Sequence, residues 1–433
     1  MRVGVIGAGP TGLVLGIALA RRGHEVTLVD RDPGPEPDGA WRRKGVMQFH
    51  HAHVMRTHAV HVVRAEVPEA YDEWLELGAE PALAGDQMVA IKAQRETYER
   101  GLRTVAMRER GVTIRRGHVD GVLVSDGRAA GLLVDGRPLN GDLVVEAAGR
   151  SSRATDALGA RESIGGSCGI AYVDRVYRLH AGAEPGPMTT PFTFAAAYDG
   201  YLAILAPHEH GIFSLIVVRR TDDKELARLR HDELWDRACA AIPGISDWTD
   251  PERSQPVTSA LAGGNLLNVY RSQRAPDGRL LLPGLVSVGD AVCTTTPIYA
   301  RGVALAMLQV SRLLQLLDAH GVDADTAVEE FADWCAAAMR PWVIEHMAID
   351  TGLARRWAGE DVFADHHLPG DLVLAAGAQN PAIGDIAGPW VSMDGGPESL
   401  EPARALAREV YATGWRPPYA DGPTRDELVA LLG

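Results

Sequence analysis

Three glycines near the N-terminus have the spacing of a phosphate-binding turn. Gly7, Gly9 and Gly12 form a Gly-x-Gly-x-x-Gly sequence directly after a short apolar run. In such a sequence the first glycine permits a tight turn, the second lets the backbone approach a pyrophosphate, and the third lets a helix pack closely on a strand. Pro10 and Thr11 would lie in the first turn of that helix, whose free N–H groups and partial positive charge attract phosphate. The motif therefore predicts a dinucleotide site.

An acidic residue completes this pattern. Residues 13–22 are predicted to form the helix, and residues 25–29 a second strand that ends at Asp30, 18 positions after Gly12. A carboxylate at this point accepts hydrogen bonds from ribose hydroxyls. The order of strand, glycine-rich turn, helix, strand and acid favours a nucleotide-binding unit over an isolated surface turn. Arg31, next to the acid, is a further candidate cofactor contact.

A second segment with the features of a cofactor site lies in the C-terminal half of the chain. Asp290 follows a predicted buried strand, Pro297 lies in the loop after it, and a long apolar helix begins with Gly302, Val303 and Ala304. The acid is suited to bind a hydroxyl of a polyol, and the helix N-terminus would stabilise an anionic reduced ring by roughly 0.3–1 kcal/mol. An ordinary strand–loop–helix connection is the alternative, and the presence of the N-terminal motif weighs against it.

Composition excludes several classes of protein. The 433 residues include 57 Asp and Glu against 43 Lys and Arg, a net charge of −14, and nucleic-acid binding is not expected of so acidic a chain. The four cysteines are too far apart for a zinc clip or a disulfide framework, so no metal site is predicted. The longest apolar stretch near the N-terminus has eight residues and no charged leader precedes it, so we expect a cytoplasmic protein without a membrane span.

The two cofactor segments together resemble a known family. On the N-terminal motif, Asp30 and the segment beginning at Gly289–Asp290, the chain is similar over about residues 1–345 to flavoprotein monooxygenases with the p-hydroxybenzoate hydroxylase fold, above all secondary-metabolism hydroxylases and epoxidases. The resemblance implies one non-covalent FAD. The glycine motif would hold its pyrophosphate, Asp30 its adenosine ribose, and Asp290 its ribityl–pyrophosphate region.

The same resemblance assigns several further positions. Arg43 and Arg95 match arginines that approach FAD, and Val119 lies where a backbone contact to adenine is expected, although each is also compatible with a surface or framework role. The family's Asp-Gly motif, which is linked to FAD and NAD(P)H pyrophosphate, reads Ala148-Gly149 here. Because there is no second dinucleotide motif, we expect NAD(P)H to dock transiently beside FAD or a separate flavin reductase to supply electrons.

Histidines supply the catalytic candidates. Residues 45–66 are predicted to be helical and contain five histidines, of which His51 and His53 are candidates for an acid/base or a substrate ligand near the flavin. Tyr299, in the loop before the apolar helix, is a candidate for lining the substrate cavity. The alternatives are a partly exposed helix face for the histidines and packing under the loop for the tyrosine.

These features predict an α/β fold with three parts. A Rossmann-like FAD-binding domain would comprise residues 1–78, 92–167 and 275–345, with a β-meander between 119 and 145. A β-sheet substrate domain would comprise residues 79–91 and 168–274. Residues 346–433 would form a helical C-terminal extension.

The function that the resemblance implies is oxygen insertion. An FAD-dependent monooxygenase would transfer one oxygen atom from O2, through a flavin C4a-hydroperoxide, to a largely apolar small molecule by hydroxylation or epoxidation. A flavin dehydrogenase or reductase and a halogenase on the same fold remain alternatives, as does a flavin-binding protein without turnover. For a halogenase, the usual Trp-x-Trp-x-Ile-Pro segment is missing, and Lys92 is a weak substitute for its lysine.

Overall fold

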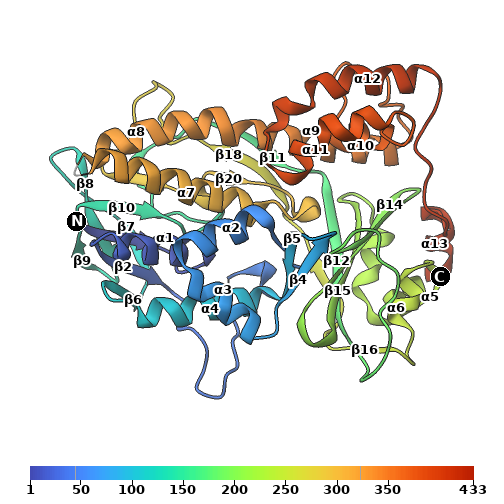
Figure 1. The fold of residues 1–433 in the computed structure, drawn as a ribbon, viewed down its shortest axis with the longest axis horizontal. Helices are drawn as coiled ribbons and strands as arrows, with labels where there is room; N and C mark the ends of the chain where they lie inside the picture. Colours follow the sequence, from blue (N-terminus) through green and yellow to red (C-terminus); the bar gives the residue numbers. More distant parts are fainter. Residues whose placement is uncertain (44, 322) are drawn as a thin grey trace.

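The computed structural model describes residues 1–43, 45–321 and 323–433 (Figure 1). The half of the molecule that carries the predicted dinucleotide motif, which we call the nucleotide-binding half, is built on a five-stranded parallel sheet in the order β19-β10-β1-β2-β6. The strands are β1 (Arg2–Ile6), β2 (Glu25–Asp30), β6 (Val112–Arg116), β10 (Leu143–Glu146) and β19 (Leu285–Ser287). The predicted α/β class and Rossmann-type sheet are confirmed.

Helices cover this sheet and share its main core. They include α1 (Pro10–Arg21), α2 (Thr57–Glu66), α3 (Pro68–Glu76), α4 (Arg95–Arg108), α7 (Gly302–His320) and α8 (Ala324–Trp334). Helix α7 is long and apolar enough to resemble a membrane span, but 56% of its most apolar window is buried inside the protein. Since the helix packs against α1, α2 and α8, its apolar character is that of a core helix.

The predicted β-meander is present. It consists of β7 (Val119–Ser125), β8 (Arg128–Val134) and β9 (Arg137–Asn140). Both of its turns place an Asp-Gly pair in the left-handed region, with φ of 51° and 75° for Asp126 and Gly127 and of 50° and 71° for Asp135 and Gly136. Two-residue turns of this conformation match the twist of the strands they join, which explains why the sequence predicted them.

A second, antiparallel sheet forms the other half of the molecule. Its strand order is β13-β14-β15-β12-β16, and β17 also pairs with β12. The strands are β12 (Ile170–Leu179), β13 (Phe194–Tyr198), β14 (Tyr201–Pro207), β15 (Ile212–Arg220), β16 (Ser254–Pro256) and β17 (Leu261–Gly263). One face packs on α5 (Asp232–Ala241), α6 (Ile245–Thr249) and α13 (Arg425–Leu432). The opposite face, set by side-chain alternation, is turned toward the nucleotide-binding half.

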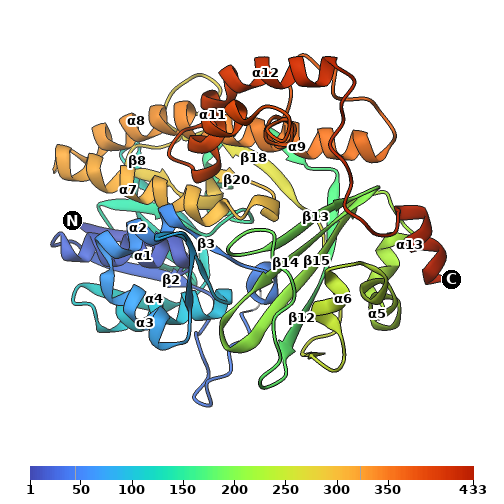
Figure 2. The same cartoon turned by 45° about the vertical axis from the view of Figure 1, so that its right-hand side comes forward.

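The C-terminal helices divide between the two halves (Figure 2). Helices α9 (Arg340–Trp357), α10 (Gly370–Ala376), α11 (Pro381–Ser392) and α12 (Glu401–Ala412) pack on the same core as α7 and α8. Helix α13 instead buries Leu428 and Leu432 in the core of the second sheet, beside α5. The C-terminal region therefore touches both halves.

The histidine-rich segment is not the helix that the sequence predicted. Residues 47–50 form a 3₁₀ turn, residues 51–54 belong to neither a helix nor a strand, β3 (Met55–Arg56) pairs with β5 (Gln87–Lys92), and α2 is the α-helix of this segment. The prediction for residues 45–56 was wrong because the backbone is bonded elsewhere. The N–H of Ala52 donates to Asp174, and Met55 pairs with Ile91.

Several shorter elements complete the fold. A 3₁₀ turn, Leu226–Arg230, precedes α5, and β19 has only three residues. The strand β4 (Glu80–Ala84) pairs with β5. A π-helical turn, Cys335–Met339, follows α8 and continues into α9.

Candidate active site

Two helix N-termini in the nucleotide-binding half have open space beside them. A Cβ added to Gly9, the N-cap of α1, or to Gly302, the first residue of α7, would meet no heavy atom of the described residues within 4 Å. A Cβ on Gly289 would lie 3.0 Å from Oγ1 of Thr11, so the segment that leads to α7 lies against the first turn of α1. Both helix N-termini therefore contribute to one region that can accept an anionic or electron-rich group.

The remaining motif glycines are needed for packing. Gly7 has a φ of 102°, and a Cβ there would lie 2.7 Å from the carbonyl oxygen of Ala147. A Cβ on Gly12 would lie 2.1 Å from the carbonyl oxygen of Gly7. Pro10 occupies the first turn of α1, where its missing N–H costs nothing. The structure thus separates Gly9, which faces open space, from Gly7 and Gly12, which have no room for a side chain.

Asp30 is held against the glycine turn. Its Oδ2 accepts hydrogen bonds from the N–H of Ala8 at 2.8 Å and from Nη2 of Arg43 at 2.9 Å. The carbonyl of Asp30 accepts the N–H of Gly117, two residues before Val119 at the start of β7. Arg31 is exposed. The structure therefore brings together Asp30, Arg43 and Gly117, the residue two positions before Val119, while Arg31 lies at the surface.

Arg43 and Arg95 share one buried carboxylate. Glu99, which is fully buried, forms ion pairs with Arg43 and with Nε of Arg95, the latter at 2.6 Å. Burial and, to a smaller extent, the nearby charge of Arg43 lower the pKa of Arg95 to about 10, and the charge of Asp290 opposes this shift. Glu99 was not predicted as a site residue. The available signal was its i,i+4 spacing from Arg95 on a helix.

The positions after β10 lie beside the glycine turn. Ala148 is exposed and contacts the Gly7 position, and Gly149 has a φ of 77° with open space around its Cα. Glu146 does not replace the acid missing at 148. It is buried, pairs with Arg161 at 2.7 Å and accepts the hydroxyl of Ser287 at 2.6 Å. Burial would raise the pKa of Glu146, but these partners hold it below its usual value.

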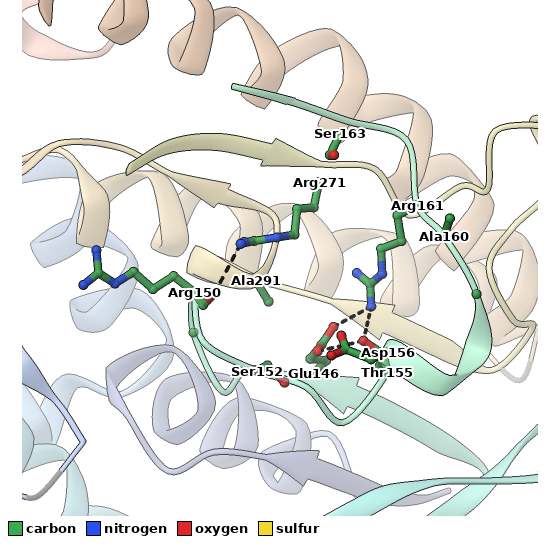
Figure 3. A pocket seen from close by; sticks show the side chains of 12 residues that line it. Glu146, Arg150, Ser152, Thr155, Asp156, Ala160, Arg161, Ser163, Arg271 and Ala291 are labelled. Atoms are coloured by element: carbon green, nitrogen blue, oxygen red, sulfur yellow. Dashed lines mark hydrogen bonds and ion pairs between the residues drawn. The ribbon is translucent and has the colours of Figure 1, made fainter. Parts of the chain in front are cut away.

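An open cleft adjoins this region (Figure 3). Its volume is about 480 Å³, and its lining includes the guanidinium groups of Arg161 and Arg271, while the side chain of Arg150 extends away from it. Arg271 donates to the carbonyl oxygens of Arg150 and Asp290, which ties the cleft to the second cofactor segment. The other lining residues are Glu146, Gly149, Ser152, Thr155, Asp156, Gly159, Ala160, Ser163 and Ala291.

Two predicted histidines meet the second sheet. Nδ1 of His51 lies 3.0 Å from Oδ2 of Asp174 on β12, a residue that was not predicted. His53 follows in the same segment, and its Nδ1 is enclosed with no hydrogen-bond partner among the residues that the structure describes. Burial lowers the pKa of His53 well below its usual value, and the charges of Arg95 and His208 act in the same direction.

Tyr299 packs beneath the loop rather than against the second sheet. Its ring lies edge-on to His346 at 5.9 Å and tilted to Trp390 at 6.3 Å. The buried guanidinium of Arg301 stacks on Tyr299, on Trp342 and on Trp390. Of the two roles considered for Tyr299, lining the substrate cavity or packing under the loop, its surroundings in the structure match packing under the loop.

The loop between Pro297 and Gly302 nevertheless touches the second sheet through Ile298. This side chain packs in a half-buried apolar cluster with Trp357 of α9 and with residues of one sheet face. We call this side of the second sheet the apolar face. Its residues in the cluster are Ile170, Tyr172, Leu202, Ile204, Ile216 and Val218. Val303 and Ala304 follow in the first turn of α7, where Ala304 is buried. The first turn of α7 and the apolar face are thus linked by a loop of five residues, 297–301.

Comparisons with known proteins agree with this architecture. A family model described as FAD binding domain matches residues 1–327. The fold is similar to that of the flavin-dependent brominase Bmp2 (15% identity, TM-score 0.64, 96% of this chain and 99% of that chain). It is also similar to PqsL, a probable FAD-dependent monooxygenase from Pseudomonas aeruginosa (19% identity, TM-score 0.58, 83% of this chain and 98% of that chain).

A curated relative matches over a much shorter stretch. D-amino acid dehydrogenase 2 of Ralstonia nicotianae is 41% identical over 49 residues, which are 11% of this chain and 12% of that protein. The residues described above fit FAD, since Gly9 and Gly302 leave open the two positions at which the cofactor would meet helix N-termini. The chain belongs to the FAD-binding domain family and has the fold of the FAD-dependent monooxygenases related to p-hydroxybenzoate hydroxylase.

Proposed function

We propose that the protein is an FAD-dependent monooxygenase that inserts one oxygen atom from O2 into a largely apolar small molecule, by hydroxylation or epoxidation. One observation carries the proposal. The loop that leads to the open first turn of α7 lies on the apolar face, so a flavin held at Gly302 would be next to a surface that suits an apolar substrate.

The cofactor would be held by residues from several elements. The first turn of α1 would bind its pyrophosphate, Asp30 its ribose, and Asp290 with the start of α7 its ribityl chain and ring. Arg43 and Arg95, fixed by Glu99, would add positive charge. When bound and reduced, FAD supplies the activation of dioxygen.

The chain's own contribution is to bind the substrate and exclude water. The side chains of Leu202, Ile204, Ile216, Ile298 and Trp357 are only partly buried, so they still offer apolar surface to a ligand. Burial of apolar surface favours binding by about 25 cal/mol per Å². Helix α9 supplies Trp357 and closes one side of this surface.

The open cleft supports NAD(P)H as the electron donor. Its guanidinium groups suit a phosphate-bearing ligand, and Gly149 and Ala291 connect it to the two cofactor segments. Two carboxylates, Glu146 and Asp156, also line the cleft, and Glu146 already neutralises Arg161. Weak, transient docking is therefore expected, and a separate flavin reductase is the alternative source of electrons.

Labelled oxygen tests the proposed function. Candidate substrates are screened for stimulation of NAD(P)H oxidation by the FAD-loaded protein, with and without a generic flavin reductase, and the product is analysed after reaction under 18O2. One labelled atom in the product is expected. An oxidised product without label would identify a dehydrogenase, and stimulation by no substrate in either arm would leave only flavin binding.

Halogenation is a second candidate, favoured by the extent of the match to the brominase, which includes the C-terminal helices. Lys92, the lysine considered for this role, pairs with Glu80 at 2.8 Å on the β4–β5 hairpin. The same assay with added bromide or chloride distinguishes the two reactions, because a halogenase gives a halogenated product without oxygen label.

A further inference from the structure

A buried arginine at the start of α7 has no acidic partner. Arg301 is the N-cap of α7 and is 1% exposed. Its Nη2 donates to the carbonyl oxygen of Trp390 at 3.4 Å. Its Nε and Nη1 are enclosed with no hydrogen-bond partner, and no carboxylate pairs with it, among the residues that the structure describes. Burial and, to a smaller extent, the nearby charge of Arg56 lower the pKa of Arg301 to about 9, so its guanidinium is still charged at neutral pH.

This position is unfavourable for a cation in two respects. A helix N-terminus carries a partial positive charge, which repels the guanidinium of an N-cap arginine. A buried charge is also costly unless it is paired. Residues that break such local rules occur at functional sites, where other parts of the fold compensate for them. The elements that compensate for Arg301 therefore indicate what its position serves.

The C-terminal helices supply aromatic rings to Arg301. Its Cζ lies 3.9 Å from the ring centre of Trp390 on α11 and 4.8 Å from that of Trp342 on α9. The two indole rings are nearly parallel, at 15°, with centres 6.5 Å apart. The ring of Tyr299 is the third face, at 5.1 Å. Ring faces attract a cation, more strongly where water is excluded. We call Tyr299, Trp342 and Trp390 the aromatic cage.

The C-terminal end of α11 adds a second attraction. The carbonyl groups of a last helical turn have no partner within the helix and carry the negative end of its dipole. The hydrogen bond from Arg301 to Trp390 ends on this turn. Arg56 donates to the carbonyl of Val391 in the same turn and, at 3.1 Å, to the carbonyl of Tyr299. Two arginines of the nucleotide-binding half thus bind the end of α11, and one of them also holds the loop 297–301.

The loop itself has a strained backbone. Ala300 has a φ of 51°, a conformation that residues other than glycine rarely adopt. Its N–H donates to the carbonyl of Pro297 and closes a short 3₁₀ turn. Such a backbone persists only where the surrounding structure holds it. Gly302, the residue after Arg301, faces open space, so a shift of the loop would change the shape of that space.

We propose that Trp342 and Trp390 are positioning residues for the flavin ring. By holding Arg301 they keep the loop 297–301 and the first turn of α7 in the form that leaves room for the ring at Gly302. Both tryptophans lie beyond residue 327, where the match to the FAD-binding family model ends, so this is a contribution of the C-terminal helices. The inference rests on the ring position at Gly302 that the proposed function assumes.

The test compares two ligands that differ in the flavin ring. The full chain is freed of FAD and titrated calorimetrically with FAD and with ADP, which has the adenosine and pyrophosphate of FAD but neither its ribityl chain nor its ring. Trp390→Leu and Arg301→Met should each raise the Kd of FAD by about tenfold, through loss of a desolvated cation–π contact, and leave the Kd of ADP unchanged. Trp390→Phe, which keeps a ring face, should restore most of the FAD affinity.

A control and a double variant assign the effect to the cage. Trp415→Leu is the matched control, because Trp415 also lies in the C-terminal region but stacks on Tyr411, outside the cage. It should leave both Kd values unchanged. Since the cage acts through Arg301, the variant that combines Arg301→Met with Trp390→Leu should bind FAD no more weakly than either single variant. Additive losses would show that Trp390 supports the site by another route and would overturn the proposal.

Two further results would overturn it. One is wild-type affinity for FAD in both Trp390→Leu and Arg301→Met. The other is an equal loss of affinity for FAD and ADP, which would indicate a general loosening of the nucleotide-binding half. The titrations need no substrate, oxygen or electron donor. Failure of oxygen labelling with the expected affinities would therefore reject the monooxygenase function and leave the role of the cage standing.

Discussion

At the scale of single residues, the glycine motif shows how far local sequence determines a site. The roles predicted for Gly7 and Gly12 follow from backbone geometry, and the structure shows the lack of space that those roles require. The surroundings of His51 follow from a contact with Asp174, 123 positions later in the chain. Short-range spacing carries no information about such a contact, and for that reason the same segment was predicted to be helical.

The open space at Gly9 gives a prediction at this scale. Gly9→Val should abolish FAD binding while the far-ultraviolet circular dichroism stays unchanged, because the new side chain would point into open space rather than into the core. FAD content is measured after purification and after reconstitution. Gly384→Val on α11 is the control, since a Cβ there also meets no atom and the position is exposed. Equal FAD content in both variants would place the pyrophosphate elsewhere.

At the scale of elements, helix α9 makes its polar contacts through one buried face. His346, Asp350, Leu353 and Trp357 recur at helical spacing, and all but Trp357 are buried. His346 lies near Thr296, and Asp350 accepts the amide of Asn268, whose own oxygen accepts the N–H of Thr296. The sequence predicted only a helical C-terminal extension over residues 346–433, and the polar contacts of α9 depend on strands and loops far away in the chain.

Asp350 gives a prediction with a defined pH dependence. Burial raises its pKa from 3.8 to about 7, so the folded protein favours the neutral acid, and ionisation costs stability as the pH rises through this range. Asp350→Asn should increase the free energy of unfolding by less than about 1 kcal/mol at pH 4 and by about 4 kcal/mol at pH 8, at 1.36 kcal/mol for each pKa unit. Denaturant unfolding at both pH values measures this difference.

An exposed carboxylate provides the control for Asp350. Asp361 pairs with Arg416 at the surface, and the side-chain hydrogen bond from that arginine lowers its pKa. Asp361→Asn should therefore bring no gain in stability at pH 8. A gain of similar size in both variants would mean that loss of negative charge from the acidic chain, rather than relief of a buried charge, is the cause.

At the scale of the whole molecule, the two halves were predictable as classes and their contact was not. The parallel sheet, the meander and the strand-rich middle follow from short patterns in the sequence. The packing of Ile298 and Trp357 in one apolar cluster, and the hydrogen bond from Arg271 to the carbonyl of Arg150, join residues that are far apart in the chain. Only the folded chain shows that the cofactor region, the cleft and the apolar face are neighbours.

The way in which the protein receives electrons also depends on the whole molecule. NAD(P)H should bind weakly to the substrate-free protein, because the chain has one dinucleotide motif and the charges of the cleft are partly neutralised. Stopped-flow reduction of bound FAD should be slow without substrate or a reductase. Arg271→Gln should slow it further, with FAD content unchanged, and the exposed Arg279→Gln should not. Tight stoichiometric NAD(P)H binding would contradict this expectation.

The last helix has a mechanical consequence. Helices α9–α12 share the core of the nucleotide-binding half, to which only Trp357 of α9 adds a contact with the apolar face, whereas α13 is anchored on the second sheet, where Arg425 pairs with Asp223 and Thr424 caps the helix. The twelve residues between α12 and α13, 413–424, form a connecting segment that spans about 40 Å when it is fully extended. A hinge movement that separates the two halves to admit a substrate can go no further than this connecting segment allows. Cleavage of the segment would permit a wider opening and would remove no residue from the cofactor region.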